Sequence, residues 1–200
     1  MPLQHTYTLF APFYDALIEN VSRRARRTSL ARLPAEGGQD VLLTGIGTGL
    51  DLPHLPRAHR YVGLDITTAM LRHAVARQSG LRLDLVRGDC RRLPFADARF
   101  DHVVAHLILA ITDDPLATLH ESARVLKPGG SLLILDKFLR PGQAAPLRRV
   151  LNPLARRLAT RLDVVFEELL AQTPALTCVA DQGVLAGGWV RTITLVKSRP

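Results

Sequence analysis

Residues 40–52 constrain the fold more than any other part of the sequence. Residues 41–43 form an aliphatic run typical of a buried parallel strand, and this run leads into three alternating glycines, Gly45, Gly47 and Gly49. Glycines at this spacing permit a tight turn and let a ligand approach backbone N–H groups. A strand, a glycine loop and a helix start in this order predict a cradle for a nucleotide-like ligand.

The composition predicts one globular domain. The chain has 200 residues, of which 47% are hydrophobic, and no apolar run approaches the roughly 20 residues of a membrane span. The first residues lack the basic region and apolar core of a secretory signal. The sequence contains 2 cysteines and no C-x-x-C pair, so we expect neither a disulfide framework nor a metal site. We therefore expect a cytoplasmic protein.

The formal net charge of +8 is concentrated outside the glycine-loop region. Residues 40–136 carry eleven basic and eleven acidic side chains, whereas residues 137–162 carry seven basic side chains and no acidic one. Two segments, residues 8–33 and 147–162, combine arginines with apolar positions at helical spacing. Each is interpreted either as a solvated surface helix or as a helix that contacts lipid headgroups, and the first could also form a lid over the site.

The order of the predicted elements indicates the fold class. Apolar runs predict four more strands after the first, and the stretches between them predict helices that begin near Thr67 or Thr68 and at Pro115. Two final β-like runs, residues 176–179 and 189–196, would pair at the sheet edge. We expect an α/β protein with a Rossmann-like, doubly wound, mostly parallel seven-stranded sheet and an antiparallel C-terminal strand pair. The four further strands are predicted at residues 60–66, 81–86, 100–107 and 131–136.

We predict a single domain over residues 1–200, with three parts. Residues 1–36 would form an amphipathic helical cap, and residues 37–136 would form a cofactor-binding core. Residues 137–200 would supply a basic helix and a closing β-hairpin. The excess charge of the flanking parts could then face an anionic surface without altering the core.

Four motifs follow one another along the central part of the chain. They are VLLTGIGTG at residues 41–49, VGLD at 62–65 with TAML at 68–71, GDCRRLPF at 88–95, and FDHVV at 100–104 with RVLKPGG at 124–130. Each motif is common by itself, but their combined order and spacing is specific. Together they resemble the class I S-adenosylmethionine-dependent methyltransferases.

The resemblance implies S-adenosylmethionine as the cofactor and assigns residues to it. The loop with Gly45, Gly47, Thr48 and Gly49 would surround the methionine part, and Asp65 would accept hydrogen bonds from the ribose hydroxyls. The remaining assignments are Ile66 against the adenine, Asp89 at the adenine amino group, the backbone N–H of Cys90 at the ring, His106 beside the sulfonium and the methyl acceptor, and Tyr14 in a segment that folds over the cofactor.

His106 is the candidate catalytic base, because imidazole can take up a proton near neutral pH. The alternative is a histidine that only lines the pocket, and Asp51 and His54 are further candidates for the base. One position departs from the family pattern: Leu43 stands where the first motif usually has an acid that helps hold the cofactor's amino group. Thr44 or Asp51 could substitute for that acid. The alternative function is a non-catalytic, membrane-associated binding protein with a degenerate cofactor site.

The resemblance also implies an amphiphilic acceptor. Relatives with an Ala-Pro-x-Tyr-Asp entry helix, here residues 11–15, include bacterial phospholipid N-methyltransferases and quinone C-methyltransferases. Arginine-rich helices would suit the anionic membrane surface where such substrates reside, and a soluble small molecule is the alternative. Nucleic acid is not expected, because aromatic residues make up only 5% of the chain. A nicotinamide-dependent oxidoreductase is disfavoured, because Leu50 occupies the third-glycine position of the dinucleotide fingerprint.

Overall fold

The computed structural model describes residues 22–78, 80–140 and 163–199. A helix over residues 22–30, which we call the N-terminal helix, is the first described element. Tyr14 and the predicted basic helix at 147–162 lie outside the described residues, so these two predictions and the three-part division of the chain stay predictions. Within the described ranges, no helix is long and apolar enough to cross a membrane.

The centre of the fold is a seven-stranded sheet in the order β3-β2-β1-β4-β5-β7-β6. The first five strands run parallel, and β7 pairs with both β5 and β6 in antiparallel fashion. The predicted α/β class and the antiparallel C-terminal pair are therefore confirmed. The strands are β1 (Asp40–Thr44), β2 (Arg60–Asp65), β3 (Arg82–Arg87), β4 (Phe100–His106), β5 (Leu126–Lys137), β6 (Leu176–Leu185) and β7 (Val190–Lys197).

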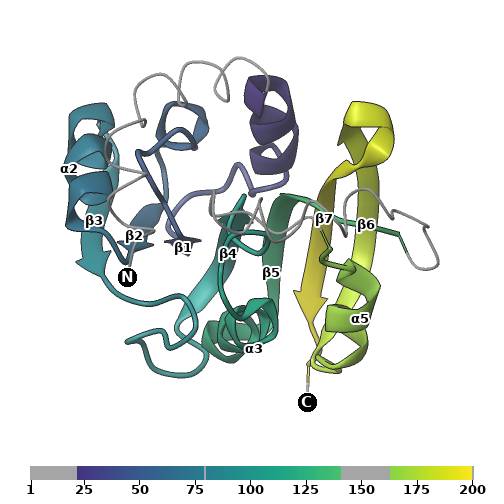
Figure 1. The fold of residues 1–200 in the computed structure, drawn as a ribbon. Helices are drawn as coiled ribbons and strands as arrows, with labels where there is room; N and C mark the ends of the chain where they lie inside the picture. The colour runs from purple at the N-terminus through teal and green to yellow at the C-terminus, as the bar shows by residue number, and fades with distance from the viewer. Residues whose placement is uncertain (1–21, 79, 141–162, 200) are drawn as a thin grey trace.

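Helices cover both faces of this sheet (Figure 1). The N-terminal helix and α2 (Thr68–Arg77) contribute Leu30, Leu71 and Ala74 to one apolar cluster. On the opposite face, α3 (Pro115–Val125) and α5 (Phe166–Ala171) pack against the second cluster. The remaining elements are two short 3-10 helices, η1 (Leu52–His54) and η2 (Ala186–Gly188).

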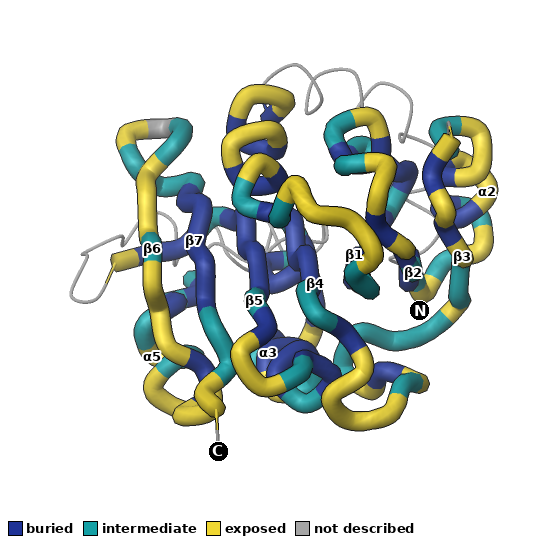
Figure 2. Tube along the Cα trace, turned by 180° about the vertical axis from the view of Figure 1, so that it is seen from behind, coloured by how far each residue is buried: buried dark blue, intermediate teal, exposed yellow. Residues whose placement is uncertain are grey.

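Most residues of β1, β4, β5 and β7 are buried, whereas most residues of the edge strand β6 are exposed (Figure 2). The residues from Leu132 to Leu135 are all completely buried. Helices α3 and α5 cover one face of β5, and the cluster that contains Leu30, Leu71 and Ala74 covers the other. A strand buried on both faces reads as a continuous apolar run rather than an alternating one. This explains why the sequence at 131–136 signals a strand by length and composition alone.

Two local expectations need correction. The strand predicted at residues 131–136 is longer than expected: β5 already begins at Leu126, because the fully buried Leu126 pairs with Phe100 at the start of β4. Thr67 does occupy the N-cap position of α2, but its side chain accepts no capping hydrogen bond. Instead the Thr67 backbone N–H donates to Asp65. The helix start is therefore tied to the end of β2.

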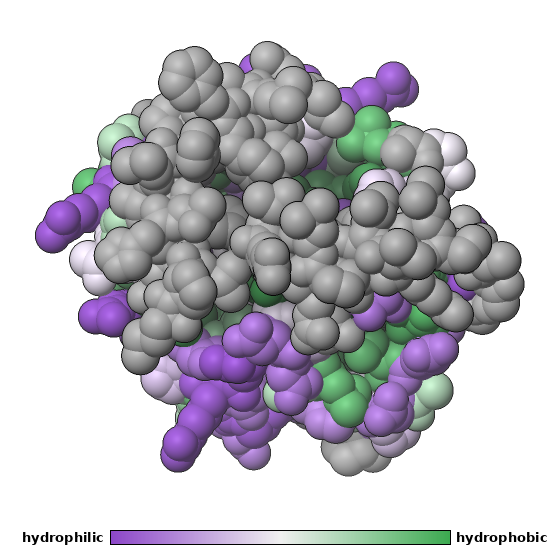
Figure 3. Space-filling model, in the orientation of Figure 1, coloured by the Kyte–Doolittle hydropathy of each residue, from purple (hydrophilic) through white to green (hydrophobic). Residues whose placement is uncertain are grey.

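The described surface on the side shown in Figure 1 is divided by polarity. Hydrophilic side chains gather over the loop that follows β3, and hydrophobic ones gather toward α5 (Figure 3). The loop after β3 carries the third sequence motif, residues 88–95, and its polar side chains form the network described below. This loop begins at the carboxyl end of β3 and leads back to the start of β4, where the carbonyls of Leu93 and Phe95 accept hydrogen bonds from Arg124.

Candidate active site

The glycine loop lies between β1 and η1, beside the point where the sheet order passes from β1 to β4. In doubly wound sheets, ligands bind at such a switch point outside the carboxyl ends of the strands. Gly45 and Gly47 both have positive φ, 66° and 57°. A Cβ on Gly45 would lie 2.5 Å from Ile108 Cδ1, whereas one on Gly47 would meet no atom nearer than 4.0 Å. Gly45 thus serves close packing, and Gly47 leaves open space beside the loop.

Asp65, at the end of β2, holds the same loop from the other side. Its carboxylate accepts the backbone N–H of Gly47 at 2.9 Å and that of Thr67 at 2.9 Å. Burial raises the pKa of Asp65 above its usual value, although these N–H groups oppose the shift. The adjacent Ile66 keeps 45% of its surface exposed, as an apolar wall for a flat ring requires. The structure therefore brings three predicted site residues, Gly47, Asp65 and Ile66, to one edge.

The neighbouring threonines have different surroundings. Thr48 is buried, and its backbone carbonyl accepts a hydrogen bond from Arg77 of α2 at 2.6 Å. Thr44, the last residue of β1, has a buried Oγ1 with no hydrogen-bond partner. A buried hydroxyl without a partner is costly, and such a group commonly marks a place where a bound molecule completes the hydrogen bonding.

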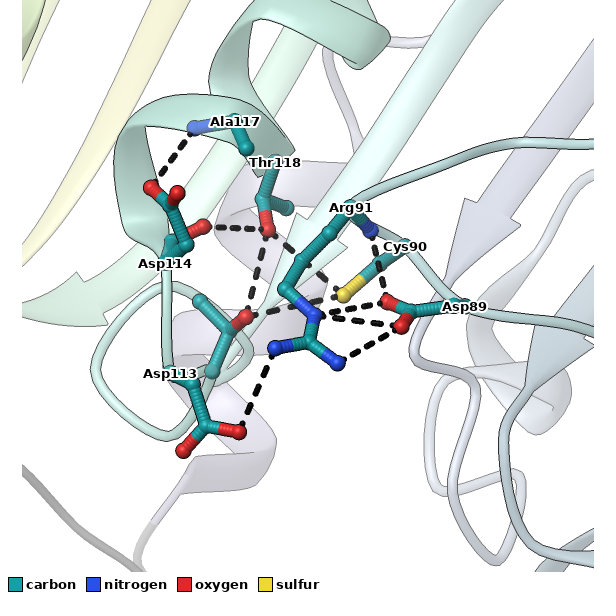
Figure 4. A network of polar contacts seen from close by, with 8 residues as sticks. Asp89, Cys90, Arg91, Asp113, Asp114, Ala117 and Thr118 are labelled. Atoms are coloured by element: carbon teal, nitrogen blue, oxygen red, sulfur yellow. Dashed lines mark hydrogen bonds and ion pairs between the residues drawn. The ribbon is translucent and has the colours of Figure 1, made fainter.

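Asp89 and Cys90, in the loop after β3, lie in a second polar network (Figure 4). The Arg91 guanidinium bonds both carboxylate oxygens of Asp89 at 2.7–3.1 Å and also reaches Asp113 at 3.3 Å. These hydrogen bonds from Arg91 lower the pKa of Asp89. The Cys90 thiol contacts Thr118 at 3.6 Å, and burial raises its pKa. Asp89 is thus an ionised, firmly oriented acceptor.

His106 ends β4 in a third network, and its side chain is only 1% exposed. Its Nδ1 lies 2.8 Å from Asp51 Oδ1, and its Nε2 lies 2.9 Å from Ser29 Oγ of the N-terminal helix. Arg26 NH1 donates to the same Asp51 oxygen at 2.8 Å, while Arg26 Nε donates to Ser22. Both ring nitrogens of His106 are therefore engaged by the protein.

Asp51 is the charged centre of this third network. Burial by itself would raise the pKa of Asp51, but the positive charge of Arg26 and the contact with His106 outweigh it, and the pKa lies well below its usual range. Asp51 is therefore ionised and can only accept hydrogen bonds. It does not have the free, near-neutral carboxyl that a general base would need, which leaves His106 as the candidate base in this network.

The predicted polar face of the N-terminal helix needs a correction at Arg26. Both interpretations of residues 8–33, a solvated helix and a helix that contacts lipid headgroups, place its arginines on the outer side, but Arg26 is 6% exposed and paired with Asp51. The helical spacing of Ser22, Arg26 and Ser29 with the buried Ala25 and Leu30 places it on the inner stripe. This spacing is the sequence pattern from which the burial of Arg26 could have been predicted. No such local pattern predicts the contact of Arg91 with Asp89 and Asp113.

Leu43 has the environment of a core residue. It is 2% exposed and packs in the cluster that also contains Val41, Leu30 and Val104. Leu43 is therefore accommodated as an apolar core residue, and the missing acid leaves no polar gap at its own position. On the neighbouring strand β4, Val104 pairs with Leu43. Two residues further along β4, His106 contacts Asp51.

Comparison with known proteins identifies the family. A model described as a methyltransferase domain matches residues 42–134. The phosphatidylethanolamine N-methyltransferase of Cereibacter sphaeroides is 32% identical over 180 residues, covering 88% of this chain and 88% of that protein. The chain belongs to the class I S-adenosylmethionine-dependent methyltransferases. The demethylmenaquinone methyltransferase of Mycolicibacterium paratuberculosis is 34% identical over 177 residues, covering 84% of this chain and 73% of that enzyme.

Solved structures share the fold of this methyltransferase. The methyltransferase bound to the Trm112 activator of Haloferax volcanii superposes with a TM-score of 0.78 at 21% identity, covering 97% of each chain. A methyltransferase from Thermotoga maritima gives a TM-score of 0.72 at 19% identity, covering 98% of this chain and 100% of that one. At these identities the likeness shows the Rossmann-like fold alone.

S-adenosylmethionine is the methyl donor of this enzyme, and the residues present fit it. The open side of Gly47, the unpartnered Thr44 hydroxyl and the exposed face of Ile66 lie around the carboxyl ends of β1 and β2. The sulfonium supplies an already activated methyl group, so the protein chiefly binds, orients and excludes water. The individual assignments of Gly45, Gly47, Thr48, Gly49, Asp65, Ile66, Asp89, Cys90 and His106 stay predictions.

We expect alanine at the two glycines to have different effects. Gly45→Ala should destabilise the protein by about 2–4 kcal/mol, because a left-handed backbone and a clash with Ile108 act together. Gly47→Ala should cost only about 1–2 kcal/mol of backbone strain. It should weaken S-adenosylmethionine binding more than Gly45→Ala does, because its methyl group enters the open side of the loop. Urea unfolding and isothermal titration measure the two effects, and equal destabilisation would contradict this account.

Asp65→Ala should weaken S-adenosylmethionine binding at least tenfold in a folded protein. The change removes the predicted ribose acceptor and also releases the N–H groups of Gly47 and Thr67. Asp84→Ala is the matched control, because Asp84 is an exposed carboxylate on the neighbouring β3. Titration calorimetry of both variants decides the matter, and unchanged affinity in Asp65→Ala would remove Asp65 from the cofactor site.

Proposed function

We propose that this enzyme methylates an amphiphilic acceptor, a phospholipid amine or a quinone precursor, at an anionic membrane surface. The observation that carries the proposal is the likeness to two such enzymes over most of the chain. The relatives named above act on phosphatidylethanolamine and on demethylmenaquinone, and each covers more than four fifths of this chain. Both acceptors are lipids, so the shared property is an apolar body with a reactive polar end.

The charge of the N-terminal helix supports the membrane part of the proposal. Arg23, Arg24 and Arg27 are exposed on this helix, whereas Arg26 points inward. Burial lowers the pKa of the nearby His54 of η1, and the positive charges of Arg27, Arg23 and Arg26 lower it further, although the charge of Asp51 opposes them. These charges make one positive area beside the carboxyl edge, and a cluster of this kind attracts anionic lipid headgroups.

The acceptor is tested by direct turnover. The purified enzyme is incubated with methyl-labelled S-adenosylmethionine and vesicles that contain phosphatidylethanolamine, demethylmenaquinol or neither. Label in one lipid extract identifies that acceptor, and Asp65→Ala, for which weaker cofactor binding is predicted, should transfer less label. Cofactor binding without label in either lipid would reject the amphiphilic acceptor while leaving the methyltransferase assignment intact.

Replacing Arg23, Arg24 and Arg27 by glutamine should lower binding to vesicles with anionic lipid at least tenfold, because each arginine near the surface contributes to the attraction. Cofactor affinity should stay within about twofold, and the difference should shrink at high salt. Arg82, Arg92 and Arg199 are exposed arginines on other elements, and their triple glutamine variant changes the net charge equally. Vesicle sedimentation measures the effect, and an equal loss in both variants would contradict a specific surface.

A further inference from the structure

The environment of His106 is asymmetric between its two nitrogens. On one side, Asp51 is an ionised carboxylate that offers Nδ1 only an acceptor, at 2.8 Å. On the other side, the Ser29 hydroxyl at 2.9 Å from Nε2 can either donate or accept. Asp51 therefore requires the proton on Nδ1. In the neutral ring, Nε2 is then the free base, and Ser29 donates to it.

Arg26 fixes the carboxylate that imposes this choice. Its NH1 bonds the same Oδ1 atom of Asp51 that contacts His106, and the side-chain exposures of Arg26 and Asp51 are 8% and 9%. A buried carboxylate held by a charge-assisted hydrogen bond rotates little. The group that sets the His106 tautomer is thus itself held in place by the N-terminal helix.

The position of this network relates it to the reaction. His106 continues the row of β4 past Val104, at the carboxyl edge where β1 gives way to the glycine loop. Asp51 comes from the far end of that same loop, directly before η1. The network therefore joins the cofactor loop to the end of β4, and its basic nitrogen faces the N-terminal helix.

We propose that Asp51 is a positioning residue that holds His106 with its proton on Nδ1, so that Nε2 accepts the proton that the methyl acceptor loses. The inference rests on the proposed function, since both proposed acceptors lose one proton for each methyl group gained. The acceptor forms a bond to the methyl carbon, the carbon–sulfur bond breaks with its electrons remaining on sulfur, and the acceptor's proton passes to Nε2. Ser29 occupies that nitrogen until the acceptor replaces its hydroxyl.

The tautomer is measured directly by nitrogen NMR on protein labelled with ¹⁵N-histidine, without substrate. In the parent enzyme, at a pH where the His106 ring is neutral, we expect a protonated Nδ1 and an unprotonated Nε2. The double variant Arg26→Met/Asp51→Leu replaces the buried pair by apolar side chains of similar size, an exchange that folded proteins often tolerate. It should shift His106 to the Nε2-protonated form. Thermal unfolding verifies that the variant is folded.

Two matched variants separate positioning from simple support of the N-terminal helix. Ser29→Ala removes the other hydrogen bond of the same ring and should leave the proton on Nδ1. Asp51→Asn retains an oxygen that both Arg26 and Nδ1 can use, so it should keep the tautomer; it also removes the charge that compensates Arg26, so thermal unfolding must show that this variant is folded. Once a methyl acceptor has been identified, kcat can be measured as well. The double variant should have at least a tenfold lower kcat, with the KM for S-adenosylmethionine within about twofold of the parent value. Asp51→Asn should retain most of the parent kcat.

The outcomes distinguish this inference from the proposed function. An unchanged tautomer in the folded double variant, or an equal shift in Ser29→Ala, would overturn the positioning role whatever the acceptor is. A shifted tautomer with unchanged kcat would overturn the role of Nε2 as base. If neither lipid is methylated, the proposed acceptor fails, and the NMR result still accepts or rejects the positioning by Asp51.

Discussion

The buried ion pair between Arg26 and Asp51 is the interaction on which the site's geometry depends. It joins the N-terminal helix to the end of the glycine loop, and through the shared oxygen it also fixes His106 on β4. Removing one partner of such a pair leaves an uncompensated buried charge and costs about 3–5 kcal/mol. The same side chains thus hold three segments that are distant in the sequence and set the orientation of the candidate base.

The glycine loop imposes a second constraint, which is steric. Close approach of Ile108 to Gly45 means that the loop after β4 packs against the loop after β1 without an intervening side chain. Asp65 then ties Gly47 to the end of β2 through a backbone hydrogen bond. These contacts hold the ends of β1, β2 and β4 in a fixed arrangement at one edge of the sheet. A cofactor that spans these strands requires such an arrangement.

The second and third polar networks, around Asp89 and around His106, have different characters. Arg91 joins Asp89 to Asp113 at the surface, with about a third of the Arg91 side chain exposed, so solvent screens this contact. The network of Arg26, Asp51 and His106 is nearly sealed from water, and its hydrogen bonds are correspondingly sensitive to the loss of one partner. The surface network is compatible with the predicted contact of Asp89 with the adenine, and the buried network is compatible with the proposed role of His106.

The sequence by itself determined the fold class, the seven strands and the order of the four motifs, because hydrophobic runs and glycine spacing are local signals. It also predicted that Asp65 and the glycines follow the ends of strands, where the structure places them. Only the tertiary structure decided that Arg26 is buried rather than exposed, that Asp51 and Ser29 flank His106, and that β5 begins at Leu126. These features are either contacts between residues 25 to 77 positions apart in the chain or a strand pairing. Contacts between residues that are distant in the sequence leave no periodic pattern, so the sequence does not predict them.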